Sequence, residues 1–450
     1  MKIVVALDSF KGSLTAVQAC DVVAKAISSV VPGAEVVTKP MADGGEGTAS
    51  VLMAAAGGQW VPRTVTGPLP EMKVEAGFVW MPESRTALVE MATASGLPLL
   101  RADQRNPLVT TTYGTGELIR AALEQGANHI LLAIGGSATV DGGVGAAMAL
   151  GWKFLTEGRK EIGLGGGELA RIAEIVAPVR SVPVRASRST GILPVGGFPN
   201  AINRVWGPSS MGVPPMNVRN SHGQDARATH GRDGRATHGR DAHATEMPDD
   251  AATNVTVEVL CDVDNPLCGD HGAARVFGPQ KGATPEMVAQ LEAGLGHLAR
   301  LVKAQLGLDI ACLPGAGAAG GLAAGAVAFL SARLISGVEA VMSQIRLPEA
   351  VAGADWVVTG EGAFDAQSLR GKVVSGVARV ARAAGARVAV CAGQVRLEPQ
   401  VYRAAGIEAA LACMEAGMEL DYAIAHGAEL LDGAARRFTR EILNEKETGP

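Results

Sequence analysis

The chain has 450 residues, 47% of them hydrophobic, and a formal net charge of -5 at pH 7. This length favours two domains, because a single hydrophobic core stops growing at about 250–300 residues. The acidic balance argues against a broad basic surface for nucleic acid or for an anionic membrane, so we expect a small-molecule partner. The six cysteines lack the paired spacing of zinc sites and are expected to be reduced core residues. The first residues, MKIVVALDSFKG, carry no signal-peptide pattern, which predicts a cytoplasmic protein.

The first sixty residues predict two strand–loop–helix units. The apolar, β-branched run Ile3–Leu7 predicts a strand, and Thr15 with Gln18 three residues later forms a capping box at the start of a helix. A second unit follows, with a strand over residues 35–41 and a helix that stops at Gly57. Short strands that alternate with helices indicate a parallel sheet.

The pattern changes after residue 60. Apolar residues alternate up to about residue 100 without intervening helices, which favours antiparallel or mixed pairing. A helix is expected to begin near Gly114, and buried strands are expected over residues 129–134 and 255–260. These segments predict a second domain with a different kind of sheet.

The C-terminal part returns to alternating units. Thr284 as N-cap and Pro285 at the first helical position predict a helix that continues to Gly307. Buried strands over 356–359 and 388–391 flank a further helix, which again indicates a doubly wound parallel sheet.

We therefore predict an α/β fold with two domains. Residues 1–60 and 285–445 would form a discontinuous, doubly wound parallel-sheet domain, and residues 61–284 would form an inserted mixed-sheet α/β domain. The cleft between them is the expected ligand site.

Residues 186–250 do not fit either domain. They contain three eight-residue repeats, HGQDARAT, HGRDGRAT and HGRDAHAT, with almost no large apolar side chains. Such a segment buries too little surface to offset its ordering entropy, so we predict a disordered surface loop within the inserted domain.

The stretch 310–332 is uncharged and rich in glycine. Its proline, glycines and alanines leave too little bulky apolar surface for a membrane span, so we expect a loop that enters a buried helix. The glycines of this loop could receive a phosphate at the helix start, or they could serve close helix packing; both interpretations remain open. The candidate phosphate-binding positions are Gly315, Gly317, Gly320 and Gly321.

The loop DSFKGS follows the first strand and opens a helix. Its backbone amides, the helix dipole and Lys11 could together bind an anion, with Asp8, Ser9, Gly12 and Ser13 around it. It is not a Walker motif. The alternative is that Asp8 and Ser13 only cap the helix.

Further acidic and hydroxyl-bearing loops follow other strands. In DGGEG, Asp43 and Glu46 stand among glycines that let carboxylates approach a substrate or magnesium, although acids also occur in ordinary turns. The loop GGSATVDGG follows a buried strand and could bind a carboxylate or phosphate. Its candidate residues are Gly136, Ser137, Thr139 and Asp141.

Three further segments carry candidate ligands. Asp262 and Asp264 end a strand, two residues apart and therefore on one face, which suggests magnesium binding or a general base. Lys281 is a flexible cation that could meet a phosphate, although a solvated lysine is nearly as consistent. Glu361 lies where a strand of a parallel sheet ends and suggests a nucleotide or metal site.

Taken together, the motifs DSFKGS, MADGGEGT, NPLVTTTYGTGEL, IGGSATVDGG, CDVDNPL, FGPQKGATPE, PGAGAAGG and TGEGAFDAQS resemble those of the glycerate kinase family, in the same order. The resemblance covers most of residues 1 to 395. It implies a flavodoxin-like domain with a second mixed α/β domain. It also implies ATP-dependent phosphorylation of D-glycerate to 2- or 3-phosphoglycerate with Mg²⁺, by in-line transfer in the interdomain cleft.

Loop chemistry and this resemblance together give candidate roles. The catalytic candidates are Lys11, Asp43 and Asp262; the nucleotide or phosphate candidates are Ser9, Gly12, Ser13, Lys281, Gly315, Gly317, Gly320, Gly321 and Glu361; the substrate candidates are Asp8, Glu46, Gly136, Ser137, Thr139 and Asp141; and the metal candidates are Asp262, Asp264 and Glu361. The expected partners are glycerate and ATP, without nucleic acid or membrane, and a homo-oligomer is allowed.

Alternatives stay open at this point. A non-catalytic protein that binds a hydroxy acid or phosphate ester, or a kinase of another small hydroxy acid, would use the same loops. An NAD-dependent reductase is disfavoured because the loop after the first strand lacks a G-x-G-x-x-G pattern.

Overall fold

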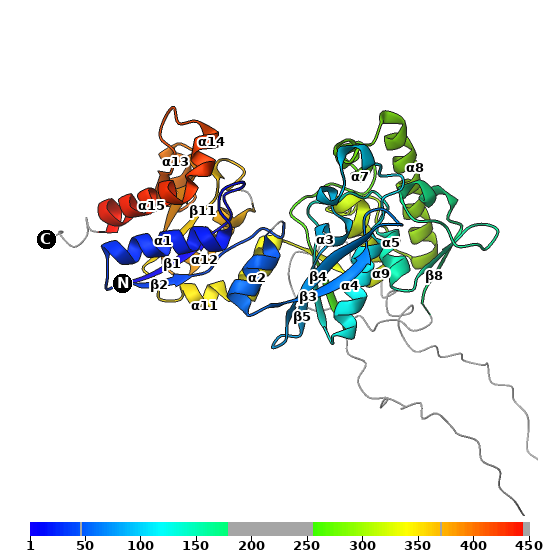
Figure 1. Ribbon diagram of the computed structural model, residues 1–450, viewed down its shortest axis with the longest axis horizontal. Coiled ribbons are helices and arrows are strands. Elements are labelled where there is room, and N and C mark those ends of the chain that lie inside the picture. The colour runs from blue at the N-terminus through cyan, green and yellow to red at the C-terminus, as the bar shows by residue number, and fades with distance from the viewer. Residues whose placement is uncertain (46, 179–254, 370, 444–450) are drawn as a thin grey trace, which may run out of the picture.

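The protein forms two α/β lobes, each built around its own sheet (Figure 1). The computed structural model describes residues 1–45, 47–178, 255–369 and 371–443. Glu46 and the predicted repeat loop over residues 186–250 lie outside the described residues. The predicted α/β class, with one parallel and one mixed sheet, is confirmed.

The first lobe contains a five-stranded parallel sheet. Its strands, from edge to edge, are β2 (Glu35–Thr38), β1 (Lys2–Leu7), β11 (Trp356–Gly360), β13 (Arg387–Ala392) and β15 (Ala409–Ala412). All neighbours pair in parallel. Counted in chain order within this sheet, the arrangement is 2-1-3-4-5, which is the flavodoxin-like order. A short parallel pair, β12 (Ala363–Phe364) and β14 (Gln394–Val395), lies beside it.

Helices cover both faces of this sheet. They are α1 (Ala16–Val30), α2 (Thr48–Ala56), α10 (Gly337–Gln344), α11 (Leu347–Val351), α12 (Val373–Ala383), α13 (Pro399–Ala404), α14 (Leu420–Ala425) and α15 (Gly427–Phe438), followed by a π-helical turn (Thr439–Leu443). Because side chains alternate along a strand, Ile3 and Val5 of β1 pack under α1 and α15, whereas Val4 packs with α12 on the opposite face. The predicted capping box starts α1: Gln18 N donates to Thr15 Oγ1 over 3.2 Å, and Thr15 N donates to Gln18 Oε1 over 3.0 Å.

The second lobe contains a six-stranded mixed sheet. Its strands, from edge to edge, are β10 (Arg333–Ile335), β9 (Thr256–Leu260), β6 (His129–Ala133), β5 (Thr86–Glu90), β4 (Lys73–Met81) and β3 (Gln59–Thr66). The first four run parallel, and β4 and β3 are antiparallel to their neighbours, as the alternating pattern after residue 60 predicts. Its helices are α3 (Ala92–Ser95), α4 (Tyr113–Glu124), α5 (Val144–Ala149), α7 (Ala273–Phe277), α8 (Pro285–Leu306) and α9 (Leu322–Leu330), with an antiparallel pair β7 (Lys153–Leu155) and β8 (Glu174–Val176).

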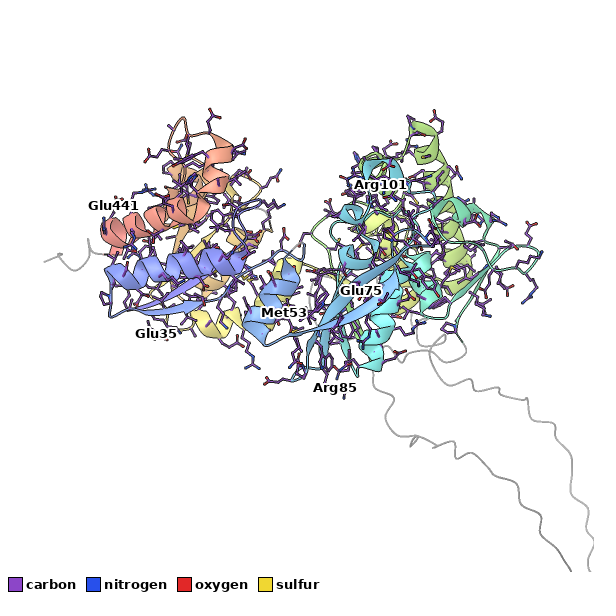
Figure 2. All side chains as sticks on the ribbon, viewed as in Figure 1. Glu35, Met53, Glu75, Arg85, Arg101 and Glu441 are labelled. Carbon is purple, nitrogen blue, oxygen red and sulfur yellow. The ribbon has the colours of Figure 1, made fainter. Side chains whose placement is uncertain are left out.

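Apolar contacts join the two lobes. The cluster on one face of the first sheet continues through α2 to Val79 and Leu88 of the second sheet. Met53, labelled on α2 in Figure 2, packs against this same cluster. The lobes therefore share a continuous region of buried side chains rather than a linker.

The chain passes between the lobes twice, at residues 57–58 and at Ser336. The second crossing corrects the predicted boundary at residue 284. Helix α8 packs with Phe154 in the second lobe, and β10 pairs with β9. The N-cap at Thr284 marks where a helix starts, but it carries no information about which sheet that helix covers.

The uncharged stretch 310–332 folds as a loop, a 3-10 turn over Ala318–Gly321 and helix α9. Ala319 (φ 53°) and Gly320 (φ 66°) have left-handed backbone within this turn, which kinks the chain before α9. Among the described residues, no helix is long and apolar enough to cross a membrane.

Candidate functional site

A pocket of about 380 Å³ lies at the carboxyl ends of β1 and β11; we call it the strand-end pocket. The helix after β1 covers one face of the sheet and the helix after β11 covers the other, so these neighbouring strands form the topological switch point where such sheets bind ligands. Acidic, basic and apolar side chains line it. They include Asp8, Asp43, Glu361 and Asp365, the cations Lys11, Lys372 and Arg396, and the apolar residues Met414, Leu420, Ile424 and Leu430.

Negative charge accumulates in the strand-end pocket. Burial raises the pKa of Asp8 to about 7, opposed by the hydrogen bond that Ser9 N donates over 2.6 Å and reinforced by Asp43 and Glu361. Burial also raises the pKa of Glu361, whereas a hydrogen bond from Ser368 lowers it. Its Oε1 atom is buried without a hydrogen-bond partner among the described residues. This arrangement favours a bound cation.

A second pocket, of about 420 Å³, lies between the lobes; we call it the interlobe pocket. The first lobe contributes residues 43–45, and the second lobe contributes residues 135–137, 260–263 and 280–281. Asp262 follows β9 and accepts a hydrogen bond from Gly337 N over 3.1 Å. Its side chain keeps exposed surface toward the pocket, yet the surrounding protein desolvates it enough to raise its pKa to about 6, with Asp43 adding to the rise.

Asp43 lines both pockets. Its loop is held by Gly45 N, which donates to Asp43 Oδ1 over 3.0 Å. Gly44 has a φ of +87°, and a Cβ there would stand 2.9 Å from Leu260 Cβ and from the Cα of Gly337. Glycine is therefore required for this loop to reach the second lobe and for Asp43 to stand between the pockets.

Lys281 lies at the wall of the interlobe pocket with only 2% of its surface exposed. Its ammonium donates to Ser137 Oγ over 2.6 Å and to Thr139 O over 2.7 Å. Burial lowers the pKa of Lys281 to about 7, and the nearby charge of Asp141 partly opposes this.

The sequence profile described as "Glycerate kinase family" matches residues 3–187 and 219–443. The chain belongs to the glycerate kinase family. The resemblance inferred from the motifs is thereby confirmed, and the protein is a kinase. A protein named glycerate kinase from Bacillus subtilis is 38% identical over 442 residues, covering 98% of each chain. A protein named glycerate 2-kinase from Escherichia coli K12 is also 38% identical over 98% of each chain.

A solved structure supports the same assignment. The crystal structure of a candidate glycerate kinase 2 from Salmonella typhimurium LT2 is 34% identical to this chain. It superposes with a TM-score of 0.75 and covers 99% of both chains.

Many of the predicted site residues of this kinase line one pocket or the other. The strand-end pocket has Asp8, Ser9, Lys11, Ser13, Asp43 and Glu361, and the interlobe pocket has Asp43, Gly136, Ser137, Asp262 and Lys281. Ser13 was expected to bind the nucleotide or a phosphate, but its hydroxyl donates to Ile424 O over 2.7 Å in this structure.

The predicted metal set is not brought together. Asp262 lies in the interlobe pocket, Glu361 lies in the strand-end pocket, and Asp264 lines neither. Within the described ranges, no three His, Cys, Asp or Glu side chains converge closely enough to hold a metal ion by themselves. Residues two apart share a face only within a strand. Strand β9 ends at Leu260, before Asp262 and Asp264, so their spacing does not place them on one face.

Asp141 is not available to a substrate. It is 1% exposed and accepts hydrogen bonds from Thr112 N over 2.8 Å, from Thr112 Oγ1 over 2.9 Å and from Gly143 N over 3.1 Å. This carboxylate ties two loops of the second lobe together. Thr139 is fully buried, and neither it nor Gly12 lines either pocket.

The glycines of the loop after Pro314 pack closely against neighbouring segments. A Cβ at Gly317 would lie 2.3 Å from Pro266 O, and one at Gly320 would lie 1.9 Å from Thr139 O. A Cβ at Gly321 would approach Gly142, and Gly315 packs on Cys261. Of the two interpretations left open for this loop, the packing one agrees with the structure.

Sequence reasoning missed several lining residues of the strand-end pocket. Arg396 lies beyond the end of β13, and the rule that ligands bind at the carboxyl ends of parallel strands could have indicated it. Leu420 and Ile424 come from the short helix α14, and no motif in that part of the sequence suggests a ligand.

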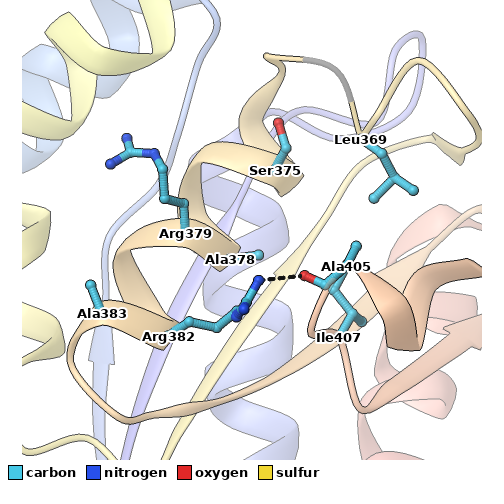
Figure 3. A pocket seen from close by; sticks show the side chains of 8 residues that line it. All are labelled: Leu369, Ser375, Ala378, Arg379, Arg382, Ala383, Ala405 and Ile407. Carbon is cyan, nitrogen blue, oxygen red and sulfur yellow. Dashed lines mark hydrogen bonds between the residues drawn. The ribbon is translucent and has the colours of Figure 1, made fainter.

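A third depression, of about 520 Å³, lies on the outer surface of α12 and is shown in Figure 3. Arg382 there donates to Ala405 O over 3.2 Å, and Arg379 is paired with Glu339. Both guanidinium groups already have partners, and none of the predicted site residues lines this depression.

Proposed function

We propose that this kinase transfers the γ-phosphoryl group of ATP to a hydroxyl group of glycerate, with Mg²⁺. The observation that carries the proposal is that Asp43 lines both pockets, so a donor in one and an acceptor in the other would meet at this carboxylate. The names of the relatives support glycerate as the acceptor.

The strand-end pocket suits the nucleotide. Lys11, Lys372 and Arg396 supply positive charge for the polyphosphate, and the pocket lies at the switch point of a doubly wound sheet. Leu420 and Ile424 offer an apolar wall for the base.

The carboxylates of this pocket fit Mg²⁺ better than the predicted metal set does. Glu361 lies close enough to Asp8 to raise the pKa of Asp8, and Glu361 Oε1 lacks a partner among the described residues. Mg²⁺ commonly binds one or two carboxylates together with substrate phosphates. Bound in this way, the ion would neutralise charge on the phosphates, and Asp8 and Glu361 would hold it.

The chain's own residues would perform the remaining tasks. The glycerate oxygen would attack the γ-phosphorus and form the new bond, and the bond from phosphorus to the β–γ bridging oxygen would break and release ADP. Asp43 would take the proton of the attacking hydroxyl, and Asp262 would orient that hydroxyl in the interlobe pocket. Lys11 would stay close to the transferred group and offset its charge.

A coupled assay of ADP release with D-glycerate, L-glycerate and glycolate tests the proposal. We expect ADP release that depends on D-glycerate and on Mg²⁺; ADP release that does not respond to glycerate would overturn it. The name of the E. coli relative supports transfer to the 2-hydroxyl, and phosphorus NMR of the product would distinguish 2- from 3-phosphoglycerate.

A further inference from the structure

The two pockets differ in the cations that line them. The strand-end pocket has Lys11, Lys372 and Arg396, which together suit a polyanion. Among the described residues that line the interlobe pocket, Lys281 is the one Lys or Arg side chain, and Asp43 and Asp262 are the carboxylates. A single cation matches a ligand with a single negative charge.

Lys281 is poorly compensated for a buried cation. Its Nζ bonds to a hydroxyl and to a carbonyl oxygen; the charge of Asp141 is near enough to act on it, but among the described residues no carboxylate forms an ion pair with it. An ammonium buried in this way costs free energy unless a counter-ion is supplied. The Ser137 hydroxyl accepts a hydrogen bond from Lys281, so its own O–H can donate to a ligand.

We propose that Lys281 and Ser137 form the receptor for the carboxylate of the acceptor substrate, and that this pair makes the kinase select a hydroxy acid over a neutral polyol. The inference rests on the proposed function and moves Lys281 from a phosphate-binding role to substrate recognition. The carboxylate would supply the counter-charge that the lysine lacks. The hydroxyl groups of the substrate would then point toward Asp43 and Asp262 across the pocket.

The test compares glycerate with glyceramide, whose carboxylate is replaced by a neutral amide, on the full-length wild type and on Lys281→Met. Calorimetry measures the Kd of each compound and of ATP separately. We expect Lys281→Met to weaken glycerate binding on the order of 10- to 100-fold, the range of a hydrogen bond to a charged group, and to leave ATP binding unchanged. The preference for glycerate over glyceramide should disappear, which a merely structural role would not cause.

Gln280→Ala is the matched control, since Gln280 lines the same pocket on the same turn but is uncharged. It should keep the preference for glycerate. If Lys281→Met does not fold, Ser137→Ala decides the question, with an expected loss of glycerate affinity of about tenfold and unchanged ATP affinity.

Loss of ATP binding in either variant would assign the pair to the nucleotide instead and overturn the inference. Unchanged glycerate affinity in Lys281→Met, or no glycerate binding by the wild type, would also overturn it. Binding is measured without turnover, so glycerate binding that depends on Lys281 but produces no ADP would support the receptor while refuting the proposed transfer reaction.

Discussion

Asp43 is the residue on which the proposed reaction depends most directly. Its carboxylate stands between the two pockets, so replacing it with asparagine removes a proton acceptor while keeping size and hydrogen-bonding capacity. We expect Asp43→Asn to lower kcat by about 10²–10⁴-fold, with a much smaller effect on KM. The control Asp264→Asn, at an exposed position that lines neither pocket, should keep kcat within about twofold of the wild type. A wild-type kcat in Asp43→Asn would remove this residue from the mechanism.

The raised pKa of Asp8 should make the stability of the protein depend on pH. Because its pKa is raised in the folded protein to about 7, the folded state binds more protons than the unfolded state above pH 4. Its contribution therefore destabilises the ligand-free protein increasingly as pH rises from about 4 through 7. The free energy of unfolding of Asp8→Asn should exceed that of the wild type at pH 8 by up to a few kcal/mol, because each unit of pKa shift corresponds to about 1.4 kcal/mol. Near pH 4 the two proteins should be nearly equal in stability.

Urea unfolding at pH 4.5, 6 and 8 without nucleotide or Mg²⁺ measures this difference. Asp21→Asn, at an exposed position on α1, should show no such change with pH. Equal pH dependence in Asp8→Asn and the wild type would contradict the raised pKa of Asp8, whose largest cause is burial.

At the residue scale, the sequence indicated which loops meet but not what surrounds each side chain. Asp43 and Asp141 are both acids in glycine-rich loops after strands. One lines two pockets, and the other is enclosed by the amides and hydroxyl groups of a neighbouring loop. Lys281 is similar: a solvated lysine and a buried one look alike in sequence. Burial depends on contacts between distant segments, which a local pattern does not contain.

The close approach of loop 43–45 to α10 gives a prediction at the scale of elements. A Cβ at Gly337 would lie 2.0 Å from Asp43 O, so Gly337→Ala must displace this loop. We expect kcat to fall by about 100-fold, as for a displacement of about 1 Å at a reacting group, together with a lower melting temperature. Gly33→Ala is the control, because a Cβ there meets nothing within 4 Å. Wild-type activity in Gly337→Ala would mean that the position of the loop is not critical.

Elements with strong local signals were predictable and elements set by packing were not. The capping box of α1 and the N-cap of α8 are chemical signals carried by a few neighbouring residues. The boundary at residue 284 was wrong because lobe membership depends on which segments bury the apolar side of α8. The contribution of α14 to the wall of the strand-end pocket could not be predicted, since that helix has six residues and no distinctive motif.

At the scale of the whole molecule, the prediction concerns the repeat segment. The family profile leaves residues 188–218 unmatched, and the segment has few core-forming side chains. We expect deletion of residues 190–248 to leave kcat/KM within about twofold of the wild type, because the sequence of this segment offers few apolar side chains to a core. The melting temperature should be unchanged or slightly higher, because a shorter connection costs less closure entropy. Loss of folding on deletion would show that the segment contributes to the second lobe.

The two short crossings between the lobes also constrain how the enzyme can move. One leads into β3 and the other leaves β10, and these strands form opposite edges of the six-stranded sheet. We expect any rotation of one lobe against the other to turn about the line that joins these two crossings. Asp262 is bonded to Gly337 N, one residue beyond the second crossing, and so lies near that line. Asp43 O also lies beside Gly337. We therefore expect such a rotation to change the spacing of Asp43 and Asp262 less than that of residues farther from the line.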